Sequence, residues 1–139
     1  SGQAYGTWEG DILKGAEGNT LRVHLISDQI INAPNYNGYR VGLTSSEQVT
    51  LHKDTGSANI LFNTANSYLN SNQWYHFKIT RTKAGVFTMW IDGVLVDVSG
   101  GSGTNPVTDT TYSTSVFTVL DLDAGDRVAN FHYTDEILQ

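Results

Sequence analysis

Hydrophobic and polar residues alternate along most of the chain, and turn-forming residues interrupt the alternation about every 8–12 positions. Because successive side chains of a strand point to opposite faces, this pattern predicts half-buried strands. We expect ten strands, at residues 5–14, 20–26, 38–44, 48–53, 59–63, 73–81, 86–92, 94–98, 116–123 and 126–136. Residues 32–38 and 99–115 are rich in polar and turn-forming residues and are expected as loops. No segment has a helical period, so the chain is predicted to be all-β.

The strongest alternation lies at residues 73–92 and predicts a hairpin with two chemically different faces. The inward set is Tyr75, Phe77, Ile79, Phe87, Met89 and Ile91. The outward set is Trp74, His76, Lys78, Thr88 and Trp90. Asp92-Gly93 follows and predicts a type I′ turn, because both central residues of that turn need a positive φ.

Composition narrows the class of partner. The net charge is −6, and the eight Lys and Arg residues are scattered along the chain. A basic stripe cannot be built from that distribution, so we expect no nucleic-acid partner. No apolar run approaches the roughly 20 residues of a membrane-spanning helix, so no membrane insertion is expected. The absence of cysteine excludes disulfides and thiolate metal sites.

The length of 139 residues is that of one domain, so residues 1–139 are expected to form a single β-sandwich. The sequence starts abruptly at Ser1-Gly2. We therefore expect this domain to be one module of a longer protein.

The run NQWYHFKITRTKAGVFTMWIDGVLVD, residues 72–97, resembles the laminin G and concanavalin A-like superfamily. That superfamily's usual form is a Trp that opens a strand, a basic turn with Gly, and an aromatic-rich strand that ends in Asp-Gly. Those places are held here by Trp74, Phe77, Ile79, Arg81, Gly85, Phe87, Trp90, Ile91, Asp92 and Gly93. Residues 126–138 resemble the final strand, which pairs near the first. The resemblance implies an antiparallel jelly-roll β-sandwich, a fold that carries lectins, glycosidases, adhesion domains and structural modules.

A second resemblance concerns three short phrases, AYGTWE at 4–9, GGSGTNPVTD at 100–109 and LDLDAGDR at 120–127. They resemble small modules in surface proteins of bacteriophages and metagenomic viruses. This resemblance implies display on a virion surface. An extracellular or virion-surface location and assembly into homo-oligomers are the corresponding expectations.

Exposed aromatic side chains on a curved sheet offer flat apolar surfaces on which sugars can stack, beside polar groups that bind hydroxyls. We interpret Trp74, His76, Lys78 and Trp90 as a candidate ligand-binding face. The alternative is that long loops cover this face and bury the tryptophans. Further candidate contacts are the tyrosines in or beside loops, Tyr36, Tyr39, Tyr68 and Tyr112, because loops often carry function.

Residues 9–14 partly match a catalytic motif. Laminarinase-like glycosidases of this fold carry Glu-x-Asp-x-x-Glu, and a retaining mechanism needs two carboxylates about 5–5.5 Å apart. Here Glu9 and Asp11 match, but Lys14 holds the place of the acid/base. The four histidines, His24, His52, His76 and His132, have no metal-binding spacing and are interpreted as solvated or rim residues. No catalytic residue is therefore predicted.

Asp121, Asp123 and Asp126 offer oxygen ligands at a spacing that suits a structural calcium ion. In the alternative, Asp123 and Asp126 only build the turn between two strands. No other cofactor is expected.

Three functional hypotheses remain. The first is a non-catalytic module that binds carbohydrate or a surface glycan. The second is a structural decoration or fibre domain of a phage-like virion that acts through protein contacts. The third is a polysaccharide-active enzyme with an unrecognised site.

Overall fold

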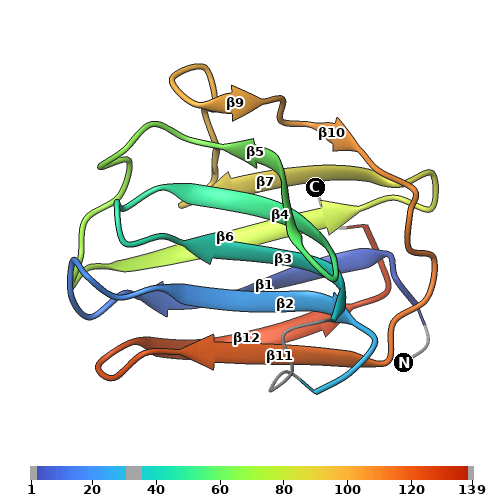
Figure 1. Ribbon diagram of the computed structural model, residues 1–139, viewed down its shortest axis with the longest axis horizontal. Coiled ribbons are helices and arrows are strands. Elements are labelled where there is room, and N and C mark those ends of the chain that lie inside the picture. The colour runs from blue at the N-terminus through green and yellow to red at the C-terminus, as the bar shows by residue number, and fades with distance from the viewer. Residues whose placement is uncertain (1–2, 31–35, 138–139) are drawn as a thin grey trace.

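Two antiparallel sheets of six strands each pack face to face as a sandwich in the computed structural model, which describes residues 3–30 and 36–137 (Figure 1). The β6 sheet has the order β10-β7-β6-β1-β12, with β8 paired to β7, and the β3 sheet has the order β11-β2-β3-β4-β5-β9. The strands are β1 (Gly6–Leu13), β2 (Leu21–Ser27), β3 (Asn37–Leu43), β4 (Val49–Thr55), β5 (Ala58–Asn63), β6 (Trp74–Arg81), β7 (Val86–Ile91), β8 (Val94–Leu95), β9 (Ser102–Gly103), β10 (Val107–Thr108), β11 (Phe117–Leu122) and β12 (Arg127–Thr134). The described residues contain no α-helix, and therefore none that could cross a membrane.

The predicted jelly-roll sandwich and its central hairpin are confirmed. β6 and β7 pair antiparallel, and all six residues of the expected inward set are buried. Asp92 and Gly93 both have positive φ, 50° and 78°, as the type I′ turn requires. The last strand, β12, pairs with the first, β1. The start at residues 1–2 and most of the expected loop at 32–38 lie outside the described residues.

Residues 99–115 differ from the expected exposed loop. They include the short strands β9 and β10, which add to β5 and β7 at one side of the sandwich (Figure 1). Beyond β10, the buried Arg81 attaches the chain to the sandwich, because its guanidinium donates to the carbonyl oxygen of Asp109 at 2.8 Å. The sequence pattern missed this because two-residue strands are too short to show alternation.

Lys14 is a fully buried cation at the end of β1. Its Nζ lies 2.6 Å from Glu47 Oε1 and donates to the carbonyl oxygens of Glu17 and Asn19, both at 3.1 Å. A buried charge is tolerated only when it is paired and hydrogen-bonded in this way. Lys14 thus links β1 to the turn at 16–19 and to the loop that carries Glu47.

We expect Lys14→Met to lower the free energy of unfolding by about 3 kcal/mol, because it leaves Glu47 and several carbonyl groups without their partner. Urea denaturation measures this change. The exposed Lys83 is the control, and Lys83→Met is expected to change stability by less than about 0.5 kcal/mol. Equal effects of the two substitutions would contradict a structural role for Lys14.

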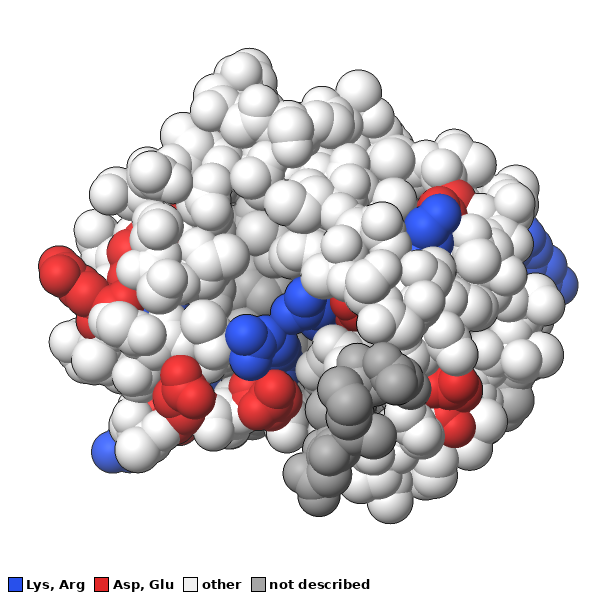
Figure 2. Space-filling view, viewed as in Figure 1, with Lys and Arg blue, Asp and Glu red and all other residues white. Residues whose placement is uncertain are grey.

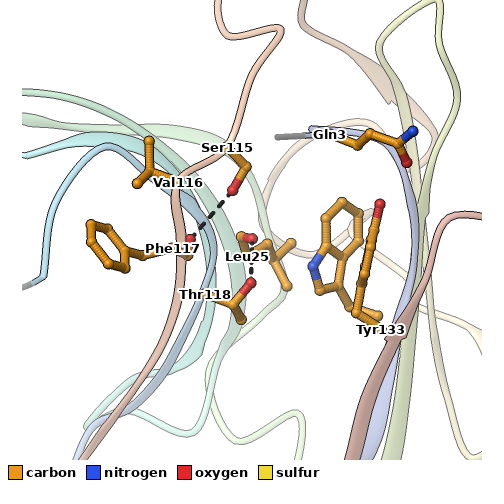
Figure 3. A pocket seen from close by; sticks show the side chains of 8 residues that line it. Gln3, Leu25, Ser115, Val116, Phe117, Thr118 and Tyr133 are labelled. Carbon is orange, nitrogen blue, oxygen red and sulfur yellow. Dashed lines mark hydrogen bonds between the residues drawn. The ribbon is translucent and has the colours of Figure 1, made fainter. Parts of the chain in front are cut away.

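As far as the described residues go, β11 and β12 are the edge strands of the two sheets, and they lie on the same side of the sandwich, which is open there (Figure 1). Leu120 and Leu122 pair with the buried Val23 and Leu21, so they belong to the inner face. They are nevertheless 42% and 38% exposed. A cavity of about 60 Å³ enters the same side, where residues 115–118 face Tyr133 across a gap (Figure 3). Core-type side chains are therefore accessible along this open seam.

Candidate functional site

One hollow on the outer face of the β6 sheet brings together three of the candidate residues, His76, Lys78 and Trp90. The register places His132 of β12, Glu9 of β1, Lys78 of β6 and Trp90 of β7 side by side in one cross-strand row. The hollow has a volume of about 260 Å³ and is lined by Glu9, His76, Lys78, Trp90 and Gly93. We call it the Trp90 hollow.

The ring of Trp90 is held in place by its neighbours in the row. Lys78 Nζ lies 5.0 Å from the centroid of the ring, within the range of a cation–π contact. On the other side Trp90 pairs with Leu95 of β8, which is 45% exposed. The hollow therefore has a half-buried indole beside an ammonium group.

His76 connects the two carboxylates of β1. Its Nδ1 lies 2.8 Å from Asp11 Oδ1, and its Nε2 lies 2.9 Å from Glu9 Oε2. Hydrogen bonds to Asp11 and then to Glu9 raise the pKa of His76, because both carboxylates favour the imidazolium form. The hydrogen bond from His76 in turn lowers the pKa of Glu9.

A bulge in β12 completes this polar network. Between Glu9 and Asp11 the register shifts by one residue, and Asn130 has a positive φ of 53°. Asn130 Nδ2 donates to Asp11 Oδ2 at 2.8 Å, and His132 Nε2 lies 3.0 Å from Glu9 Oε1. The bulge therefore lets both β12 side chains reach the carboxylates of β1.

We expect the pKa of His76, followed by NMR, to lie above the ordinary histidine value of 6.5 and to fall in Asp11→Asn. Because the pKa of His76 is raised in the folded state, its ion pairs contribute fully to the stability of the fold below pH 6.5. This contribution to stability is lost as the pH rises through the folded-state pKa of His76. His132 is the internal control, because the backbone carbonyl of Asn130 is the main cause of its own raised pKa. An unchanged pKa of His76 in the variant would contradict this network.

The partial glycosidase motif does not form a catalytic pair with Lys14. Glu9 and Asp11 share the outer face, as alternation predicts, and both are bound to His76. Lys14 is buried against Glu47 and cannot act as an acid/base on that face.

Trp74, Tyr68 and Tyr36 lie apart from the Trp90 hollow. Trp74 is 46% exposed on the same sheet face, but it pairs with Leu13 and does not line the hollow. Tyr68 is partly buried, and its hydroxyl accepts a hydrogen bond from the backbone N–H of Asp97 at 3.0 Å. Tyr36 lines a different hollow, on the outer face of the β3 sheet.

The interpretation of Tyr39 as a ligand contact is wrong, because its side chain is fully buried. Its hydroxyl lies 2.5 Å from Asp109 Oδ1, and burial raises its pKa to about 12. Tyr112 is partly buried, and its hydroxyl donates to the carbonyl oxygen of Asp54 at 2.6 Å. Both tyrosines attach the segment around residues 109–112 to the sandwich.

Asp121, Asp123 and Asp126 are not gathered into the expected calcium site. Among the described residues, no group of three or more His, Asp or Glu side chains is placed to hold a metal ion. Asp121 pairs with Arg22 at 3.4 Å. Asp123 Oδ2 accepts from the N–H of Thr20 at 2.7 Å, and Asp126 Oδ2 accepts from the N–H of Asp123 at 2.9 Å. The alternative role, building the turn between β11 and β12, is what the structure shows.

The outer face of the β3 sheet carries polar residues that the sequence did not single out as a site. The register places His24, Arg40 and His52 side by side on β2, β3 and β4. His24 is 1% exposed, so the interpretation of all four histidines as solvated is wrong at this position. Figure 2 shows this face hollowed near its centre, where basic and acidic side chains lie next to each other.

Most of the chain also matches a known family. The family described as the concanavalin A-like lectin/glucanases superfamily matches residues 17–130, and the chain belongs to it. This confirms the resemblance to the laminin G and concanavalin A-like superfamily. The comparison with curated proteins found no match.

Solved structures with the same fold include a carbohydrate-binding module, a galectin and a congerin. The carbohydrate-binding module CBM66 from Bacillus subtilis has a TM-score of 0.73 and 20% identity, over 94% of this chain and 75% of that chain. The Caenorhabditis elegans galectin LEC-6 has a TM-score of 0.64 and 12% identity, over 96% and 86%. The ancestral congerin Con-anc has a TM-score of 0.62 and 8% identity, over 95% and 92%. At these identities the likeness shows the fold alone.

Proposed function

We propose that this protein is a non-catalytic carbohydrate-binding module and that its ligand occupies the Trp90 hollow. The observation that carries the proposal is the cross-strand row in which Trp90 and Lys78 lie beside the His76–Glu9 pair. A half-buried aromatic ring next to a few oriented polar groups is the usual chemistry of a small-ligand site. The carbohydrate-binding module and galectins of the same fold support this assignment.

The polar groups of the hollow suit hydroxyl recognition. Glu9 accepts hydrogen bonds, while Lys78 donates them, so the two together can bind neighbouring hydroxyl groups. The network on Glu9 fixes its carboxylate before a ligand arrives, which reduces the entropy lost on binding. The volume of about 260 Å³ lies just below the range for drug-sized ligands. We therefore expect one sugar residue to occupy the hollow, with the rest of the glycan along the sheet.

From the same proposal we infer where the protein acts and what it binds. The ligand is a glycan of an extracellular or cell-surface component, which agrees with the lectins and binding modules of this fold. Display on a virion stays a prediction, as does the place of the domain within a longer protein.

Trp90→Ala is expected to weaken glycan binding at least tenfold, a change of about 1.4 kcal/mol, because the sugar loses the ring on which it stacks. Glycan-array screening followed by titration calorimetry measures it. Trp74→Ala is the matched control, since Trp74 lies on the same face outside the hollow. Equal losses in the two variants would contradict the placement, and no binding of any glycan by the wild type would contradict the function.

One observation, the open seam between β11 and β12, favours a second function. In this function the protein acts through contacts with other protein chains. Among the described residues, β11 pairs only with β2 and β12 only with β1. An edge strand can pair antiparallel with its own copy about a two-fold axis. We propose a second copy of this chain as the partner, because such pairing would extend both sheets and cover Leu120 and Leu122.

Leu120→Asp is expected to convert such a dimer to a monomer, because it places a charge in the covered seam. Sedimentation velocity at several protein concentrations measures the change. Ile60→Asp is the control, because Ile60 is exposed on β5, away from the seam. A wild type that stays monomeric at high concentration would contradict self-association.

A further inference from the structure

The outer face of the β3 sheet holds a row of three nitrogen-bearing side chains. Arg40 of β3 lies between His24 of β2 and His52 of β4 in the antiparallel register. Cross-strand neighbours on one face are close enough for their side chains to interact. This row lies on the opposite side of the sandwich from the Trp90 hollow.

Two hollows meet at Arg40. One, of about 220 Å³, is lined by Arg22, Arg40, Gly42, Thr50 and His52 among others, and the second, of about 190 Å³, by Tyr36, Arg40 and Asp54 among others. Gly42 lies between Arg22 and Thr50 in the next row, where it contributes no side chain to fill the space. The guanidinium of Arg40 therefore borders accessible space on two sides.

Much of the hydrogen-bonding capacity of this row is unused. Arg40 Nε donates to Asp54 Oδ2 at 3.0 Å, and no bond is formed by its two terminal nitrogens among the described residues. Within residues 3–30 and 36–137, the buried His52 Nδ1 has no hydrogen-bond partner, and neither do the two ring nitrogens of the almost fully buried His24. Buried polar groups without a partner are costly, and they are commonly satisfied by a ligand or water.

Burial and the two nearby arginines both disfavour the charged form of the histidines in this row. Burial first, and then the charges of Arg40 and Arg22, lower the pKa of His24 to about 3 and of His52 to about 4. Asp54 and Asp121 pair with the two arginines, so the face is not strongly basic as a whole. At neutral pH both imidazoles are uncharged, and each can present an N–H donor.

We propose that Arg40 and His52 form a second binding site, for an oxyanion group, on the face opposite the Trp90 hollow. The terminal nitrogens of Arg40 suit the two oxygens of one carboxylate or sulfate, and His52 supplies a further donor. His24 lies on the other flank of Arg40 and makes a T-shaped contact with the ring of Tyr36, with the ring centroids 5.0 Å apart. His24 does not line either of the two hollows, so the site is assigned to Arg40 and His52.

The oxyanion site also indicates which class of glycan the protein would bind, an inference that rests on the proposed function. A glycan-binding module with an oxyanion site would favour acidic saccharides, those that carry carboxylate or sulfate groups. The two faces would then contact different saccharide chains or different parts of one chain.

Inorganic sulfate tests the site without any glycan. At pH 6.5 we expect sulfate to cause saturable NMR shifts of the His52 and His24 ring signals and little change at His76 and His132. Because Arg40→Gln alone would leave Asp54 buried and unpaired, the test uses Arg40→Gln/Asp54→Asn. This variant should weaken sulfate binding at least tenfold, as should His52→Leu. Arg127→Gln, at an exposed arginine of the other sheet, is the control and should bind as the wild type does.

Shifts that do not saturate, or that are equal at all four histidines, would overturn the oxyanion site. An acidic oligosaccharide compared with its carboxyl-reduced form tests the ligand class. Preference for the acidic form that is lost in Arg40→Gln/Asp54→Asn supports the class, and equal binding overturns it. If the wild type binds no glycan while sulfate still binds at His52, the proposed function fails and the oxyanion site stands.

Discussion

The antiparallel register of β1 against β6 is the constraint on which both the fold and the Trp90 hollow depend. It pairs Trp8 with Ile79 toward the core and Glu9 with Lys78 toward solvent. A shift of one residue would exchange the two faces of the strand, so burial of Trp8 fixes the register firmly. The same contacts that stabilise the core therefore place the polar row on the opposite face.

The bulge in β12 interrupts the regular pairing of β12 with β1 and thereby allows the polar network to form. At the shift, Phe131 lies beside Gly10 and stacks on Phe77 with the ring centroids 6.2 Å apart. Its neighbours in the chain, Asn130 and His132, then both point to the outer face and bind the carboxylates of β1. A Cβ at position 10 would lie 3.0 Å from Phe131 Cα, so Gly10 permits the close approach of the two strands.

The polar side chains on the two outer faces of the sandwich differ in how their hydrogen-bonding groups are satisfied. On the β6 sheet, His76 is satisfied by Asp11 and Glu9, and burial of the network is partial. On the β3 sheet, in the part of the chain that the structure describes, Arg40 has one hydrogen bond, to Asp54, and the buried nitrogens of the flanking histidines have none. The first arrangement is preorganised around an aromatic ring, and the second retains donors for a group that the chain does not supply.

The sequence determined the all-β class, the β6–β7 hairpin, its turn and the inward set, because alternation and turn chemistry are local properties of neighbouring residues. It also placed His76, Lys78 and Trp90 on one outward face. Only the tertiary structure decided that Glu9 and His132 join them, that Tyr39 is buried, and that His24, Arg40 and His52 form a row. Those outcomes depend on the pairing and register of strands far apart in the chain, and a periodic pattern carries no information about which strand lies beside which.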